Sequence, residues 1–231
     1  MVRDLPPRTI CLTFHDIVSE RTSTSLWFDC SVPELNAELD CLTRRGAHFV
    51  TVDQLYRHLS SEAPLPAHPV CITFADNYLG FLTYAYPILS RRHIPCTMFV
   101  HTGYVGAGVG RPKMSWPQLQ DLDRQGLVDV ESQTVTHPAD LRLLPDDRVQ
   151  HEMEDSKHDL EKHLGHSIRY VAYPNGKFDT RSERAAKSAG YIMGFSEELR
   201  PAENSPSLFA VARYVHTKYK RAWIDANRPR R

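Results

Sequence analysis

Short apolar runs alternate with stretches of helical periodicity along this chain of 231 residues, and that alternation limits its possible folds more than any other feature. Strands and helices that follow one another through short connections form parallel sheets with right-handed crossovers. We predict strands at residues 9–14, 49–52, 70–74, 95–101, 127–130, 168–173 and 191–195. Units in this number favour a barrel over an open sheet. The sequence therefore predicts an α/β protein, a distorted (β/α) TIM-like barrel of about seven parallel strands.

The helices between these strands have their own start and stop signals. In the stretch 32–45, Ser31 can cap the helix, Pro33 suits its first turn, and Gly46 follows its last turn. Further helices are predicted at residues 53–59, 79–92, 117–125, 146–164 and 182–189, with Asp53 as a cap. The glycine-rich stretch 103–113 is predicted to be a mobile loop.

The composition suits one domain and argues against several classes of partner. A content of 41% hydrophobic residues, with no internal repeat and no long linker, predicts a single domain over residues 1–231 with its core at about 9–215. Acidic and basic side chains number 28 each, so no global field would attract nucleic acid or an anionic membrane. No apolar run is long enough to predict a membrane span.

The cysteines and the N-terminal residues bear on the cellular compartment. The five cysteines show no CxxC pairing, so neither a zinc-thiolate cluster nor a disulfide framework is predicted. Residues 1–7 lack the apolar segment of a signal peptide, which predicts a cytoplasmic protein. A secreted or cell-envelope location is the alternative if a leader had been removed.

Polar residues follow the ends of four predicted strands, where barrels of this kind hold their active sites. These residues are His15 and Asp16 after the first strand, Asp76 after 70–74, His137 beyond 127–130, and Tyr173, Pro174 and Asn175 at the end of 168–173. The fold would bring them to one edge of the sheet. Because Asp and His side chains around an open coordination position bind zinc in hydrolases, the pattern indicates a metal-hydrolase site.

The same segments resemble the motifs of the polysaccharide deacetylase family (carbohydrate esterase family 4). TFADNY at 73–78 is similar to the family's TFDDGY, SQTVTH at 132–137 to SHTVTH, and AYPNGKFD at 172–179 to an AYPYGKYD-like segment. LTFHD at 12–16 resembles a motif of the branch that de-N-acetylates poly-N-acetylglucosamine. The resemblance, which extends over about 9–215, implies a divalent metal (zinc, cobalt, nickel or manganese). It also implies hydrolysis of N-acetyl carbon–nitrogen bonds and an N-acetylated glycan or oligosaccharide as partner.

Carried over residue by residue, the resemblance implies a role for each of these positions. Asp76 and His137 would be metal ligands, and His15 would be the general acid, with Asp16 orienting it or lining the site. The backbone N–H of Asn175 would stabilise the oxyanion. Tyr173 and Pro174 would contact the sugar, and Tyr104 and Trp116 are further aromatic candidates for stacking on it.

Two chemically important positions depart from the family pattern, and Asn77 also stands where the family has Gly. Ala75 stands where the family has the Asp that acts as base, so a factor of about 10²–10⁴ in rate is lost unless another carboxylate replaces it. Asp16 and Glu131 are the candidates for that replacement. Gln133 stands where the family has its first His ligand, and its amide oxygen would be a weak ligand that favours harder cations. Metal binding is therefore expected to be weak or absent.

Three functions remain open after this comparison. The chain is a metal-dependent deacetylase with reduced or altered activity, a glycan-binding pseudoenzyme on the same fold, or an amide hydrolase for a small substrate. Simpler interpretations also stand beside the site. Asp76 could cap a following helix, His137 could be an ordinary loop residue, and His15 could be a buried structural residue.

Overall fold

Eight strands form one parallel sheet in the computed structural model, which describes residues 8–61, 63–108 and 110–228. Around the sheet they run in the order β10 (Tyr214–Val215), β1 (Ile10–Phe14), β5 (Pro69–Ala75), β6 (Cys96–Val100), β7 (Val128–Ser132), β8 (Tyr170–Ala172) and β9 (Met193–Phe195). The remaining strand, β4 (His48–Val50), pairs with the start of β5. Val211 bridges Phe195 of β9, and β10 pairs with β1, so the segment 211–215 joins the two edges. The predicted distorted barrel of about seven parallel strands is confirmed.

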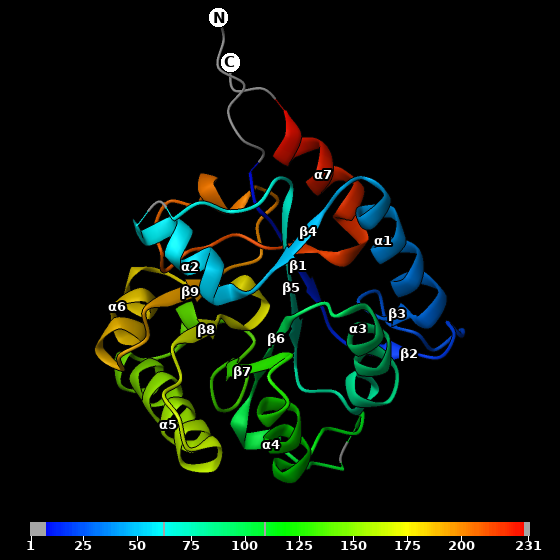
Figure 1. Ribbon diagram of the computed structural model, residues 1–231. Helices are drawn as coiled ribbons and strands as arrows, with labels where there is room; N and C mark the ends of the chain where they lie inside the picture. Colours follow the sequence, from blue (N-terminus) through cyan, green and yellow to red (C-terminus); the bar gives the residue numbers. More distant parts are fainter. Residues whose placement is uncertain (1–7, 62, 109, 229–231) are drawn as a thin grey trace, which may run out of the picture.

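The helices lie around the outside of these strands (Figure 1). They are α1 (Val32–Arg44), α2 (Val52–Ser61), α3 (Tyr86–Arg92), α4 (Trp116–Arg124), α5 (Asp146–Leu164), α6 (Thr180–Ser188) and α7 (Tyr219–Asn227). The predicted cap of α1 is present: the Ser31 side chain accepts from the Glu34 N–H, and the Glu34 carboxylate accepts from the Ser31 N–H at 2.8 Å. The cap of α2 is Thr51 rather than Asp53, because the Gln54 N–H donates to Thr51 Oγ1 at 3.1 Å.

Four elements among the described residues, β2, β3, β10 and α7, lie outside the sequence prediction. The small pair β2 (Ile17–Val18) and β3 (Cys30–Ser31) follows β1, and β10 and α7 follow residue 213. Helix α7 buries Ala222 and Ala226 in the same core as β1 and α1. The core therefore extends beyond the predicted limit near residue 215.

The buried apolar side chains form two clusters. The larger one lies between the strands and the surrounding helices, and the smaller one includes Cys11, Cys71, Phe99 and Phe195 from the strands. Arg213 lies wholly buried among the side chains of the second cluster, with its guanidinium 5.2 Å from the ring centre of Phe99. A buried charge requires an oppositely charged or hydrogen-bonding partner. The Arg213 guanidinium therefore indicates a polar group near it, at the end of the sheet strands.

Strand register brings several polar residues to the carboxyl edge of the sheet. Phe14 pairs with Phe74, Ala75 with Phe99, and Val100 with Ser132. The residues that directly follow these strands, His15, Asp76, His101 and Gln133, consequently emerge at the same edge. The sheet thus assembles a polar cluster from residues far apart in the chain.

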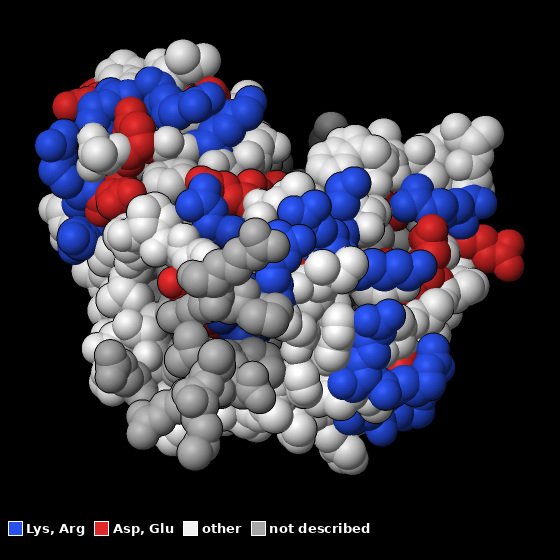
Figure 2. Space-filling model, turned by 90° about the horizontal axis from the view of Figure 1, so that it is seen from above, with Lys and Arg blue, Asp and Glu red and all other residues white. Residues whose placement is uncertain are grey.

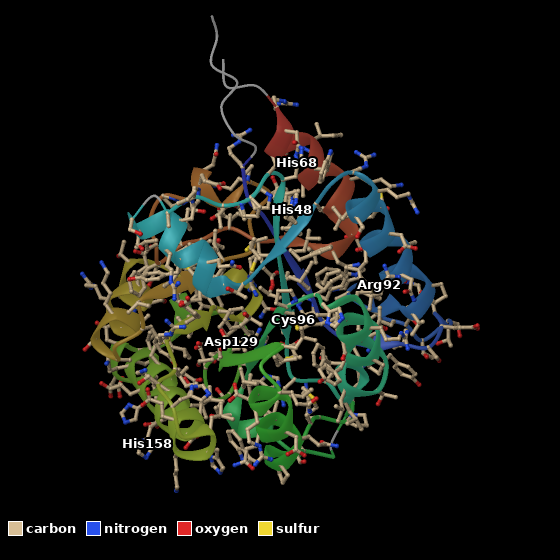
Figure 3. The ribbon with its side chains drawn as sticks, in the orientation of Figure 1. His48, His68, Arg92, Cys96, Asp129 and His158 are labelled. Carbon is tan, nitrogen blue, oxygen red and sulfur yellow. The ribbon has the colours of Figure 1, made fainter. Side chains whose placement is uncertain are left out.

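The surface repeats the charge balance of the sequence. On the face seen in Figure 2, basic side chains gather in separate groups with acidic side chains beside them. His158 on α5 is exposed and points outward, as Figure 3 shows, in agreement with the expected solvated face of that helix. None of the helices among the described residues is both long and apolar enough to span a membrane.

Candidate functional site

Asp76 and His137 face one another at the carboxyl edge of the sheet. Asp76 follows β5 with a backbone φ of 69°, in the left-handed region that Asp tolerates better than most residues. His137 also has a positive φ, 50°, and its Nε2 lies 3.4 Å from Asp76 Oδ1. That oxygen is buried and has no hydrogen-bond partner among the described residues. No helix begins directly after Asp76, so the residue is not a helix cap.

Helix α5 fixes the loop that carries His137. The Glu152 carboxylate accepts the N–H groups of Val135 and Thr136 at 2.8 and 2.9 Å, and the Thr136 hydroxyl donates to it at 2.5 Å. A carboxylate that accepts several donors holds such a turn firmly. Glu152 therefore positions His137, a contribution that no sequence motif indicated.

His15 belongs to the same cluster. It is 9% exposed, its Nδ1 has no partner, and its Nε2 lies 3.9 Å from Glu197 Oε1. Glu197 also faces the buried guanidinium of Arg213 at 3.8 Å. Burial lowers the pKa of His15, and the charges of Asp76 and Glu197 oppose that effect. His15 is therefore buried, and its immediate surroundings are titratable groups rather than apolar side chains alone.

The surroundings of Asp76 favour its charged form. Burial raises the pKa of this carboxyl group, but the nearby imidazoles of His15, His137 and His101 outweigh burial and hold the pKa below its usual value. We call these four residues the Asp76 cluster. A charged carboxylate with a free oxygen, surrounded by imidazoles, is a donor set suited to a divalent cation.

Asp16 is not directed at His15. Its carboxylate accepts from Arg111 Nη1 at 2.8 Å, and Arg111 also donates to Asp29 at 2.5 and 2.8 Å. The predicted orienting role and the suggested role as a substitute base are therefore not supported. Arg111 instead ties the 103–113 loop, expected to be mobile, to the segment after β1.

Gln133 and Glu131 also differ from expectation. The amide oxygen of Gln133 accepts the Asp76 N–H at 2.9 Å, so this side chain holds the Asp76 turn. The Glu131 carboxylate accepts the N–H groups of Arg169 and Tyr170 at 2.9 and 2.8 Å. Gln133 as a weak ligand and Glu131 as a substitute base therefore stay predictions, and in this structure the Gln133 amide oxygen and Glu131 Oε2 accept backbone N–H groups instead.

The turn after β8 lies beside the His137 loop, but two of its residues are buried. Tyr173 is 0% exposed and stacks on Phe178 at 4.6 Å, so it is a core side chain and cannot stack on a sugar. Pro174 is likewise buried. Asn175 is exposed, has a φ of 53°, and donates through Nδ2 to the Ala139 carbonyl at 3.2 Å. That bond places the Asn175 backbone next to the loop that carries His137.

His101 and Lys113 are members of this region that sequence reasoning missed. His101 follows β6 directly, and its ring centre lies 5.4 Å from that of His137. Burial lowers its pKa to about 3, and the charge of Lys113 acts in the same direction. Lys113 Nζ donates to the Asp76 carbonyl at 2.7 Å, and burial lowers its pKa to about 8. The strand-end rule would have found His101, but the predicted strand 95–101 included it.

Exposed aromatic side chains border the Asp76 cluster. Trp27 is 66% exposed with its ring centre 6.3 Å from that of His15, and Tyr104 is 45% exposed at 5.2 Å from His101. Trp116 instead stacks on His163 at 3.8 Å, between α4 and α5. Trp27 and Tyr104 are therefore the aromatic side chains placed to contact a sugar.

A second group of metal-ligating side chains lies apart from the predicted ligands. Among the described residues, Cys30, Glu38 and His216 are the only three whose donor atoms all fall within 4.8 Å of one another. All three are buried, and His216 Nδ1 is 3.0 Å from Glu38 Oε1. A measurement of metal binding to this protein must therefore distinguish an ion at Cys30, Glu38 and His216 from an ion at the Asp76 cluster.

Comparisons with known proteins agree on the family of this site. Residues 62–194 match the family model described as polysaccharide deacetylase. The poly-β-1,6-N-acetyl-D-glucosamine N-deacetylase of Staphylococcus aureus is 28% identical over 192 residues, which is 77% of this chain and 64% of that protein. The chain thus spans slightly less than two thirds of the staphylococcal relative.

Solved structures share the whole architecture. IcaB from Ammonifex degensii superimposes with a TM-score of 0.84 at 27% identity, covering 96% of this chain and 98% of that one. The deacetylase PplD from Streptococcus pyogenes, solved in complex with acetate, gives a TM-score of 0.85 at 24% identity, with 97% and 100% coverage.

Proposed function

The chain belongs to the polysaccharide deacetylase family, and from that premise we propose that it hydrolyses N-acetyl amide bonds of a glycan of the poly-N-acetylglucosamine type. One observation carries the proposal: the Asp76 carboxylate lies 3.4 Å from His137 Nε2 and keeps a buried oxygen without a hydrogen-bond partner. The choice of glycan is supported by the staphylococcal relative, which is named for that polymer.

The donors of the Asp76 cluster fit a divalent cation. Asp76 offers a free carboxylate oxygen, and His137 presents Nε2 to the same side. Asp and His are common ligands of catalytic zinc. A cation held there would polarise the substrate carbonyl and acidify the attacking water. Gln133 contributes indirectly, because its bond to the Asp76 N–H keeps the carboxylate in place.

We assign proton transfer to His15. Ala75 has no group that can accept a proton, and the carboxylates of Asp16 and Glu131 are bound elsewhere. His15 faces Asp76 and Glu197 and retains a ring nitrogen without a partner. It would take a proton as the water oxygen attacks the amide carbon. It would then return that proton to nitrogen as the carbon–nitrogen bond breaks, releasing acetate and a free amine. The backbone of Asn175 lies near enough to the His137 loop to line the opposite side.

The use of one imidazole, His15, as both base and acid predicts slow turnover. In a site with a separate base and acid, each group is in its required protonation state at the same time, whereas one imidazole must serve both steps here. The missing base alone accounts for a loss of about 10²–10⁴-fold.

The test measures acetate release from β-1,6-linked N-acetylglucosamine oligomers. Wild-type protein should release acetate slowly and stop when a chelator removes the metal. Ala75→Asp should accelerate release by about 10²–10⁴-fold, and Asp76→Asn should abolish it in both backgrounds. No release by either wild type or Ala75→Asp, in folded and metal-loaded protein, would contradict the proposed hydrolysis.

A glycan-binding role without turnover is the second candidate. It is favoured by the combination of a missing base at Ala75 with exposed aromatic side chains, Trp27 and Tyr104, beside the cluster. Calorimetry with the same oligomers separates the two functions. Binding without acetate release in wild type and in Ala75→Asp would establish this second role.

A further inference from the structure

We propose that His101 is the third protein ligand of the cation, taking the place of the imidazole that is missing at Gln133. The inference deepens the proposed function and rests on it for the use of the metal. Its test reads metal binding and not turnover, so the two can fail separately.

The topology puts His101 in the required position. Strand β6 lies between β5, which ends before Asp76, and β7, which leads to Gln133. A residue that directly follows β6 therefore emerges between the Asp76 turn and the His137 loop. The 5.4 Å separation of the His101 and His137 ring centres, with the rings perpendicular, places the two imidazoles beside each other.

The chemical state of His101 also calls for a ligand. The side chain is 6% exposed, and neither Nδ1 nor Nε2 has a hydrogen-bond partner among the described residues. A buried polar atom without a partner costs about 1–3 kcal/mol. A His that only filled space would be better replaced by an apolar residue, whereas a metal ligand gains its partner when the cation binds.

Completion of the set requires a movement of at least one side chain. In this structure the donors of Asp76, His101 and His137 do not all lie within 4.8 Å of one another. We assign this movement to the imidazole of His101, which would rotate toward Asp76 when the cation binds. Because its ring nitrogens have no partner among the described residues, the rotation breaks none of the hydrogen bonds found there. His101, which directly follows β6, thus replaces the first of the two loop imidazoles that the family resemblance implies, while His137 keeps its place on the loop.

The experiment compares zinc affinity in chelator-treated protein by competition titration. The variants are His101→Ala, Gln133→His and their combination, with His158→Ala on the exposed face of α5 as the matched control (Figure 3). Wild type should bind one zinc. His101→Ala should lower the affinity by at least about 100-fold, since even outer-shell partners contribute about 10–100-fold. Adding Gln133→His to His101→Ala should restore most of it, and His158→Ala should have no effect.

Two results would overturn the assignment. One is unchanged zinc affinity in His101→Ala. The other is absence of zinc binding by wild type under conditions where His101→Ala/Gln133→His binds it. Absorption spectra of the cobalt-loaded wild type and Cys30→Ser variant show whether the ion is bound at Cys30 instead of at the Asp76 cluster. Absorption bands from a cobalt–thiolate bond, lost with Cys30→Ser, would place the metal at Cys30, Glu38 and His216 and would also refute the proposal. Thermal melting of each variant establishes that it is folded.

Discussion

Asp76, which directly follows β5, and Glu131, in β7 on the other side of β6, are both buried carboxylates of the same sheet, and their surroundings are opposite. Glu131 is 1% exposed, and its Oε2 accepts two backbone N–H groups, from Arg169 and Tyr170. Asp76 is 8% exposed, and its Oδ1 has no hydrogen-bond partner among the described residues. Both lie within one sheet, so the difference comes from local donors and not from the fold.

The pKa values of the two groups also shift in opposite directions. Burial, with help from Asp129, raises the pKa of Glu131 well above its usual value despite the backbone donors. At Asp76 burial acts the same way, but the surrounding imidazoles outweigh it. A carboxylate that the backbone satisfies is part of the structure, whereas one left free among imidazoles can bind a ligand.

The substitution Asp76→Asn should have the largest effect that distinguishes Asp76, as a metal ligand, from Glu131, as a structural carboxylate. The variant removes the carboxylate charge from the Asp76 cluster and keeps its shape. We expect zinc affinity to fall by at least about 100-fold, more than the loss from an outer-shell partner. Because the depressed pKa of Asp76 means that the folded state favours the charged carboxylate, the melting temperature should fall slightly. Calorimetric zinc titration and thermal melting check both expectations. A cooperative fold that melts well below wild type would show that Asp76 is mainly structural.

Glu131→Ala should have the opposite profile. It leaves the N–H groups of Arg169 and Tyr170 buried without an acceptor, at a cost of about 1–3 kcal/mol each. For a chain of this length we expect the melting temperature to fall by at least about 4 °C. Zinc affinity should be unchanged. A loss of zinc binding in folded Glu131→Ala protein would break the comparison.

The fold was more predictable than the site, for a physical reason. Buried parallel strands are apolar on both faces. The strands β1 and β5 can therefore be recognised in the sequence as the mainly apolar runs ICLTF and PVCITFA. Strand ends then indicated His15, Asp76 and His137. The partner of each side chain is a long-range property that no local pattern encodes. Gln133 turns its oxygen to a backbone N–H, and Glu152 reaches the His137 loop from α5.

Two further misses have specific causes. Tyr173 was predicted to contact substrate because aromatic side chains often stack on sugars, but its ring stacks on Phe178 in the core. The strands β2, β3 and β10 contain two residues each, which is too few for the alternation of apolar and polar residues to be recognised in the sequence. Helix α7 lay beyond the expected core.

The pH dependence of stability offers a finer test of Glu131. Its pKa is raised in the folded protein, so its stabilising contribution is complete below the pKa of the unfolded chain and is lost as pH rises through the folded pKa. Wild type should therefore lose melting temperature relative to Glu131→Gln as the pH rises above the ordinary pKa of a glutamic acid. Melting curves of both proteins across that range measure the difference. A constant difference would mean that Glu131 does not titrate as described.

The smallest expected effect concerns the exposed aromatic residue beside His15. Trp27→Ala removes a ring placed to stack on a sugar, and such a contact contributes about 0.5–1.5 kcal/mol, or roughly 2- to 12-fold in affinity. Calorimetric titration with N-acetylglucosamine oligomers should show that loss, with Leu143→Ala on the exposed η3 turn (Leu141–Leu143) as the control. Equal affinity in the two variants would remove Trp27 from the site.

Anomalous diffraction at the zinc absorption edge, from crystals grown with zinc, would locate the bound cation. We predict one strong peak between Asp76 Oδ1 and His137 Nε2, with the His101 ring turned toward it. An empty map at that position, or a peak only beside Cys30, Glu38 and His216, would contradict it.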